Sequence, residues 1–157
     1  MLAGVEFDLR GLIQVGAESK SGGKYPTQVA DIVVQRACQR LHFLHAAIDA
    51  GGIPDNTQIG SYVIHYSNGE HAQFPIVIGQ SLADWFTQPN QEKETFTIAW
   101  TGQNAESRRQ GRTIRLFKST WENPTPAETI RSIDFYVGHR ARTFWAAPFL
   151  VAVTAEP

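Results

Sequence analysis

The strongest constraint on the fold of this chain is a period of two in its apolar residues. In TFTIAWT (Thr95 to Thr101), Phe96, Ile98 and Trp100 alternate with threonine and alanine. Because successive side chains of a β-strand point to opposite faces, this pattern predicts a strand with one buried face. It places Trp100 in the core. Apolar spacing typical of helices is nearly absent elsewhere in the chain.

A hairpin is predicted around Asn68-Gly69, within SYVIHYSNGEHAQFPIVIG (Ser61 to Gly79). This dipeptide favours a two-residue turn in which both residues have positive φ. Such a turn would set the register with Tyr66 opposite His71, and it would place His65 and His71 on opposite faces. The face expected to be core holds Val63, His65, Ala72, Phe74 and Ile76, and the other holds Tyr62, Ile64, Tyr66, His71 and Gln73.

Two details refine the pattern in later strands. In TIRSIDFY a bulge near Arg131-Ser132 is expected, because it would turn both Ile130 and Ile133 inward. In APFLVAVT both alternating sets are apolar, as in a central strand that is covered on both sides. Further strands are predicted at Val5 to Leu9, Leu12 to Val15, Ile32 to Val34, Arg40 to Ala46, Ile114 to Trp121, Thr129 to Tyr136 and Pro148 to Thr154.

Helical structure is expected only at SLADWF (Ser81 to Phe86) and in a turn around Ala105 to Arg109. Ser81 and Asp84 have the spacing of a capping box at the start of the first of these helices. The polar stretch Glu18 to Pro26 is predicted to be a loop. Many short, mostly antiparallel strands without βαβ alternation indicate an all-β fold, either a two-sheet sandwich or a barrel.

Length and charge narrow the class of protein. The 157 residues predict a single domain over residues 1–157, and a domain cut from a longer protein would look the same. The net charge of -1 gives no general attraction to nucleic acid or to a membrane surface. The basic run SRRQGR (Ser107 to Arg112) is expected to be a solvated loop. No run approaches the ~18 apolar residues of a membrane span.

The candidate nucleophiles give little evidence for catalysis. Cys38 is the single cysteine, so it forms no intrachain disulfide, and we expect it to be a small buried apolar residue. Ser81 in GQSLA is similar to a nucleophile elbow, but Ala83 replaces the final glycine and the βα units of a hydrolase are absent. The sequence therefore predicts a protein that is not an enzyme.

Candidate metal ligands are equally sparse. His42 and His45 are three residues apart on a predicted strand, so they should face opposite sides. His45 and His65 are expected to be core-edge imidazoles bonded to backbone rather than zinc ligands. Glu6 and Asp8 share a strand face and would be the oxygen donors of any structural Ca²⁺. We expect no cofactor beyond such a calcium ion.

Aromatic residues favour binding as the function. The chain has four Trp, four Tyr and nine Phe, and Trp85, Trp121 and Trp145 fall near predicted strand ends or in loops. Flat apolar rings beside polar groups suit the C–H faces and hydroxyl groups of sugars. In IRLFKSTWENPTP, Arg115 and Trp121 share one strand face, and Asn123-Pro124 ends the strand.

Six blocks carry a resemblance to a known kind of domain. They are RLHFLHAA, GSYVIHYSNGEHAQFPIVIG, DWF, IAWTGQN, IRLFKSTWENPTPAETIRSIDF and APFLVAVTAE, and they span roughly Val5 to Glu156. In this order they resemble an accessory domain of larger bacterial proteins that is similar to galactose-binding-like carbohydrate-binding modules. The resemblance implies a jelly-roll sandwich that binds a glycan in loops at one end, in an extracellular, periplasmic or envelope setting.

These observations together predict a non-catalytic, carbohydrate-binding module. The alternative is a structural or protein-interaction domain that docks on its parent protein, and a hydrolase ranks third. The expected partners are a glycan and other domains of a parent protein, but neither nucleic acid nor a membrane. In the predicted site, Trp121 and Trp85 stack on the sugar, and Arg115, Asn123, His71 and Tyr66 supply polar contacts.

Overall fold

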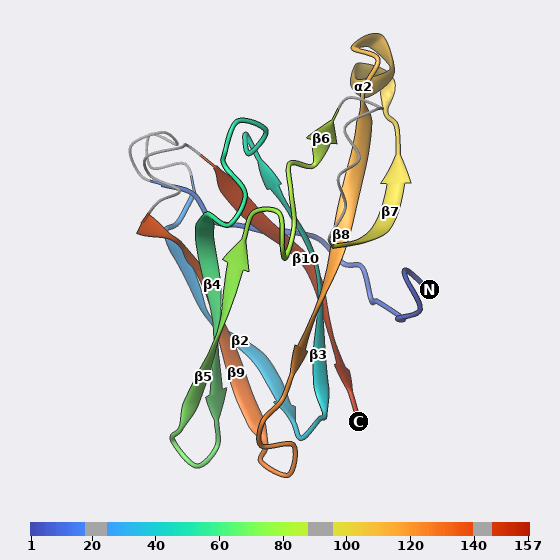
Figure 1. Ribbon diagram of the computed structural model, residues 1–157. Coiled ribbons are helices and arrows are strands. Elements are labelled where there is room, and N and C mark those ends of the chain that lie inside the picture. The colour runs from blue at the N-terminus through green and yellow to red at the C-terminus, as the bar shows by residue number, and fades with distance from the viewer. Residues whose placement is uncertain (18–24, 88–95, 140–145) are drawn as a thin grey trace.

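The structure is a computed structural model that describes residues 1–17, 25–87, 96–139 and 146–157 of the chain. Two antiparallel β-sheets pack face to face (Figure 1), which confirms the predicted all-β sandwich. Most of the predicted polar loop from Glu18 to Pro26 lies outside the described residues.

The first sheet has the strand order β1-β10-β3-β8, and β6 and β7 both pair with β8. Its strands are β1 (Ile13–Gln14), β10 (Ala147–Glu156), β3 (Arg40–Ile48), β8 (Thr113–Glu122), β6 (Phe86–Thr87) and β7 (Thr97–Gly102). The second sheet has the order β2-β9-β4-β5, formed by β2 (Gln28–Arg36), β9 (Ile130–Val137), β4 (Gln58–Tyr66) and β5 (His71–Val77).

Most predicted strands are confirmed, but the one at Val5 to Leu9 is wrong. This part of the chain forms no ladder beyond an isolated bridge between Leu2 and Val5. It instead crosses the outer face of the first sheet, where Lys118 Nζ donates to the carbonyl of Ala3 at 2.8 Å and Thr154 Oγ1 donates to that of Glu6 at 2.7 Å. Alternation alone cannot supply the neighbouring strand that a ladder needs.

The β4–β5 hairpin differs from the predicted one by a single residue of register. Gly69 has φ +92°, whereas Asn68 does not have positive φ, so the turn is not the predicted two-residue form. Gly69 N–H donates to the Tyr66 carbonyl, and Tyr66 N–H donates to that of Glu70. These bonds describe a three-residue loop in which Gly69 forms a bulge. His65 is therefore paired with His71.

This shift reverses the faces predicted for β4. Tyr62, Ile64 and Tyr66 point into the core and are at most 4% exposed. His65 and His71, predicted to lie on opposite faces, share the outer face with their ring centroids 6.4 Å apart. A slip of one residue moves every side chain of a strand to its other face.

Two bulges place large side chains elsewhere. The bulge predicted at Arg131 is confirmed, because His65 pairs with Ser132 and Tyr66 with Ile130, and both Ile130 and Ile133 are fully buried. A second bulge in β7, between Ile98 and Trp100, was not predicted. Trp100 is 42% exposed, so its assignment to the core is wrong.

The predicted helix at Ser81 to Phe86 is also wrong. Asp84 does not cap a helix there; its carboxylate accepts hydrogen bonds from the backbone amides of Ala50, Gly51 and Phe86. The segment is thereby tied to the end of β3. The other predicted turn is a short helix, α2 (Ala105–Arg109), capped by Asn104.

The core lies between the two sheets. Phe43 of β3 stacks on Tyr62 of β4 with ring centroids 4.2 Å apart, and Tyr62 stacks in turn on Phe135 of β9. Stacked rings contribute more than their buried area alone. Because the space between the sheets is filled, binding sites are expected at the two ends, at the two open sides or on the outer faces of the sandwich.

Candidate functional site

A chain of polar groups crosses the core at His45, which is fully buried. Its Nδ1 lies 3.0 Å from Tyr62 Oη, and its Nε2 lies 2.9 Å from Ser119 Oγ. Ser119 Oγ donates to the Ser81 carbonyl at 2.8 Å, so it accepts a hydrogen bond from Nε2–H, and Tyr62 donates to Nδ1. Burial lowers the pKa of His45 to about 3. The imidazole is therefore neutral and structural, with side chains on both ring nitrogens and the Ser81 backbone nearby, which acts to raise the pKa against the larger effect of burial.

The candidate nucleophiles are both inside the sandwich. Cys38 is 2% exposed, as expected, and burial raises the pKa of its thiol. Ser81 is 8% exposed; its Oγ accepts a hydrogen bond from Val77 N–H and donates to the Pro75 carbonyl. Both bonds hold the chain that follows β5 in place, so the Ser81 hydroxyl has a structural role.

An end pocket of about 540 Å³ lies where the β4–β5 hairpin meets the loop between β8 and β9. The two connections are joined by a hydrogen bond from Ser67 N–H to the Thr129 carbonyl, and Figure 1 shows them at the same end of the sandwich. The pocket is lined by Tyr66, Glu70, His71, Ala72, Pro124 and Thr125. Two of the six predicted site residues, Tyr66 and His71, are among them.

Asn123, a third predicted site residue, fixes this end from within. Its Oδ1 accepts hydrogen bonds from Tyr66 Oη at 2.6 Å and from Thr125 N–H at 3.0 Å, while its Nδ2 donates to the Cys38 carbonyl at 2.8 Å. Asn123 is 7% exposed. It therefore holds two pocket residues in place and does not itself line the pocket.

Trp121 and Trp85 lie at opposite ends of the sandwich. Trp121 is paired with Leu41 at the start of β3, whereas Trp85 N–H donates to the carbonyl of Ala47. Six residues of extended strand correspond to about 20 Å, so the two indoles do not share a pocket. Both are partly buried against the core.

Arg115 belongs to the Trp85 end. Its backbone N–H donates to the Trp85 carbonyl, and its guanidinium lies 5.3 Å from the centroid of the Phe117 ring. It shares a strand face with Trp121, as predicted, but that face points inward and Arg115 is only 6% exposed. Trp145, the third tryptophan noted in the sequence, lies outside the described residues.

A polar cluster occupies the outer face of the second sheet next to the end pocket. Asp134 accepts hydrogen bonds from Asp31 N–H, His65 Nε2 and Tyr136 Oη at 2.8, 2.9 and 3.1 Å. Partial burial acts to raise the pKa of Asp134, but these bonds stabilise the carboxylate and hold the pKa below its usual value. His71 lies across from His65 on this face.

Metal ligands do not gather in the part of the chain that the structure describes. No group of three or more His, Cys, Asp or Glu side chains there is placed to hold an ion. Asp8 forms an ion pair with Arg10 at 2.7 Å. His42 and His45 do face opposite sides, as predicted: His42 Nε2 bonds to Glu156 at 2.6 Å, on the side away from Tyr62. None of the described helices is long and apolar enough to cross a membrane.

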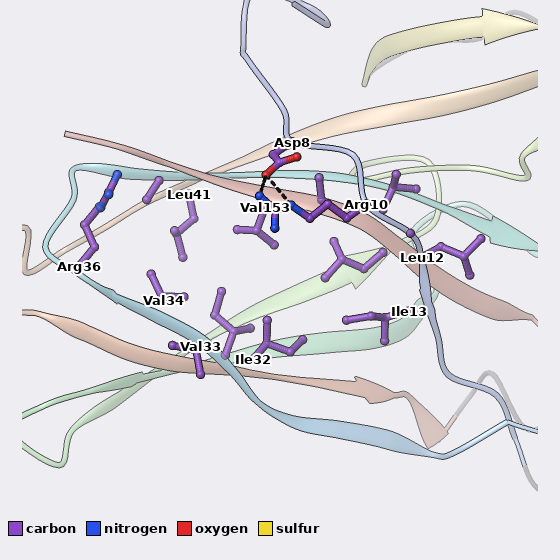
Figure 2. Close-up of a pocket in the computed structure, with 16 residues that line it drawn as sticks. Asp8, Arg10, Leu12, Ile13, Ile32, Val33, Val34, Arg36, Leu41 and Val153 are labelled. Atoms are coloured by element: carbon purple, nitrogen blue, oxygen red, sulfur yellow. Dashed lines mark hydrogen bonds and ion pairs between the residues drawn. The ribbon is translucent and has the colours of Figure 1, made fainter.

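A side cavity of about 570 Å³ opens between the edges of the two sheets. Figure 2 shows β2 residues facing Val153 of β10 across it, with Arg36 at one end and Ile13 at the other. Its lining is mostly aliphatic and includes Leu12, Ile13, Ile32, Val34, Leu41 and Val153.

Sequence reasoning missed four lining residues of the end pocket and the whole side cavity. The four are within two residues of the predicted ones, so a search around the Asn68-Gly69 and Asn123-Pro124 turns could have found them: Glu70, Ala72, Pro124 and Thr125. The cavity is formed by strands that are distant in sequence, and no local motif marks it. Comparisons with protein-family models, with curated proteins and with solved structures found no match.

Proposed function

We propose that this chain is a non-catalytic module that binds a glycan in the end pocket. The observation that carries the proposal is the convergence of Tyr66, His71 and Asn123 on one end of the sandwich. Carbohydrate-binding modules of the kind that the sequence resembles bind in loops at such an end. The strand orders β1-β10-β3-β8 and β2-β9-β4-β5 are consistent with the proposed jelly-roll form.

The lining of the pocket suits a sugar. Glu70 offers acceptors, while His71 and Thr125 offer both donors and acceptors, and this mixture matches hydroxyl groups that do both. Pro124 and Ala72 supply apolar surface for the C–H groups of a pyranose.

The pocket is also preorganised. The Tyr66 ring is held by its bond to Asn123, and the same amide oxygen accepts the Thr125 N–H. Groups that are ordered before binding lose less entropy when a ligand arrives. Trp121 stands two residues before Asn123 and packs on the core, so its contribution in this proposal is to anchor the end of β8 that leads to Asn123.

A glycan array followed by titration calorimetry tests the proposal. The wild-type protein should bind at least one glycan, and His71→Ala should weaken that binding by about tenfold, since roughly 1.4 kcal/mol is lost with a good polar contact. Gln73→Ala, an exposed change two residues along β5, serves as the matched control. Trp85→Phe should leave the affinity unchanged because Trp85 lies at the other end.

Two results would count against the proposal. Failure to bind any glycan would remove the glycan as a ligand, and equal binding by His71→Ala and wild type would move the site elsewhere. A loss confined to Trp85→Phe would place the ligand at the Trp85 end instead.

A further inference from the structure

One edge of β10 is open beside the side cavity. β1 pairs with β10 only at Phe149 and Leu150. From Val151 to Ala155, no backbone group of a described residue pairs with that edge. An unpaired strand edge presents free amide and carbonyl groups to any extended chain that lies beside it.

The side chains around this edge match a covered strand, but the described residues cover them only in part. Both alternating sets of APFLVAVT are apolar, yet Val151 to Ala155 are only half-buried, in contrast to Pro148, Phe149 and Leu150. Five large hydrophobic residues are strongly exposed in the described parts of the chain: Met1, Leu9, Leu12, Val33 and Trp100. Leu12 and Val33 line the side cavity, and Leu9 lines a hollow that adjoins it.

The cavity and this hollow form one slot with three walls. The hollow, of about 700 Å³, is lined by Glu6 to Leu9, by Arg36 and by Val153 to Ala155, so it shares Asp8, Arg36 and β10 with the cavity. β10 forms one wall, β2 the second and residues 8–12 the third, as Figure 2 shows. Since neighbouring strands lie about 4.8 Å apart, an extended chain that runs along β10 in this slot lies within hydrogen-bonding reach of its edge.

The two strand edges that border the slot are not equally able to pair. β2 is bulged in its ladder with β9, and Asp31 and Gln35 have φ of +55° and +49°. Bulges of this kind disrupt the regular spacing of donors and acceptors that a new strand would need. β10 has one bulge, at Val151, where its register with β3 shifts between Leu150 and Ala152, and it pairs regularly with β3 from Ala152 to Glu156. The edge of β10 from Ala152 onward is therefore the regular one that is available for pairing.

Charge marks one end of the slot. Arg36 makes no ion pair with any described residue, whereas Asp8 is occupied by Arg10. Arg36 lies with Ala155 in the hollow, near the end of β10. A strand antiparallel to β10 would begin there, so an acidic residue near its N-terminal end would meet Arg36.

We propose that this slot binds an extended segment of a partner protein, which pairs antiparallel with Ala152 to Ala155. Alternate apolar side chains of that segment fill the cavity, and an acidic residue near its N-terminal end pairs with Arg36. This mode is strand addition: main-chain hydrogen bonds provide affinity, and the pockets for alternate side chains provide specificity. The slot and the end pocket share no residue, so each proposal can fail without the other.

The test uses a synthetic peptide, acetyl-Glu-Thr-Val-Thr-Val-Thr-Val-Lys-amide, labelled with a fluorophore on its lysine. Fluorescence anisotropy should show saturable binding to the wild-type protein. Arg36→Gln should weaken binding three- to fivefold, as expected for an exposed ion pair. The matched control Arg131→Gln removes an exposed arginine of β9 and should leave the affinity unchanged. Hydrogen exchange of the amides between Val151 and Ala155 should slow when the peptide is added.

A second peptide, with proline in place of the central valine, separates strand addition from simple apolar binding. Proline lacks the amide that pairs with β10, so binding should fall by more than tenfold. Equal binding of both peptides, or an absence of saturable binding, would overturn the proposal. Displacement of the peptide by sodium dodecanoate at equal concentration would assign the slot to an acyl chain, and a stable dimer in sedimentation without peptide would assign it to a second copy.

Discussion

At the scale of single residues, His45 illustrates how the core controls a titratable group. The imidazole is enclosed between the sheets and has a hydrogen-bond partner on each nitrogen. Its neutral form satisfies both partners, whereas a protonated ring would place a charge where no carboxylate is bonded to it. Burial is thus the main cause of its low pKa.

Stability should therefore decline in acid. Between the ordinary pKa near 6.5 and the folded value of about 3, the unfolded chain binds a proton at His45 and the folded chain does not. Stability is complete above this window and falls by roughly 1.4 kcal/mol per pH unit within it. Urea unfolding of wild type and His45→Gln between pH 4 and 8 measures the effect. The free energy of unfolding of the variant should depend less steeply on pH than that of wild type. An equal pH dependence of the two proteins would contradict the low pKa of His45.

Gly69 is the residue that decides the register of the hairpin. An alanine at its φ of +92° would be strained, so Gly69→Ala should destabilise the protein by about 1–2 kcal/mol. Gly11→Ala is the control, because Gly11 has ordinary φ and open space around it. Thermal unfolding compares the melting temperatures of the two variants. Equal melting temperatures would argue against a turn with positive φ at Gly69.

At the scale of elements, bulges determine which side chains reach the core. The bulge at Arg131 was visible in the sequence because Ile130 and Ile133 could not otherwise both be buried. The bulge before Trp100 was not visible, since Phe96, Ile98 and Trp100 form an unbroken alternation. A local pattern reveals a bulge only when the bulge breaks that pattern.

Arg131 is the extra residue of the bulge in β9, so deleting it should leave Ser132 and Ile130 in regular alternation, with Ile130 still opposite Tyr66. The deletion should therefore cost less than Ile130→Ala, which empties the place of a fully buried side chain and should cost about 2–5 kcal/mol. Arg131→Ala keeps the backbone length and should change stability by less than about 0.5 kcal/mol. Denaturant unfolding of the three variants measures this, and a deletion as costly as Ile130→Ala would contradict the inferred bulge.

At the scale of the whole molecule, the positions of most strands could be predicted from the sequence, but the residues that lie together in space could not. The period of two located β3, β8 and β10 closely. It could not predict that Tyr66 lies next to Asn123 or that Trp85 lies far from Trp121, because these distances depend on register and sheet order. Asn68-Gly69 fits two kinds of turn, and the choice between them reverses one strand face.

The most direct test of the proposed function is to map the glycan site by ¹H–¹⁵N chemical-shift changes. The probes are soluble cello-, xylo- and galacto-oligosaccharides, added singly to the labelled protein. Saturable shifts should concentrate at Glu70, His71, Ala72 and Thr125, and none should occur around Trp85. Shifts concentrated at the Trp85 end, or no shifts with a glycan that the array identifies as bound, would contradict this proposal.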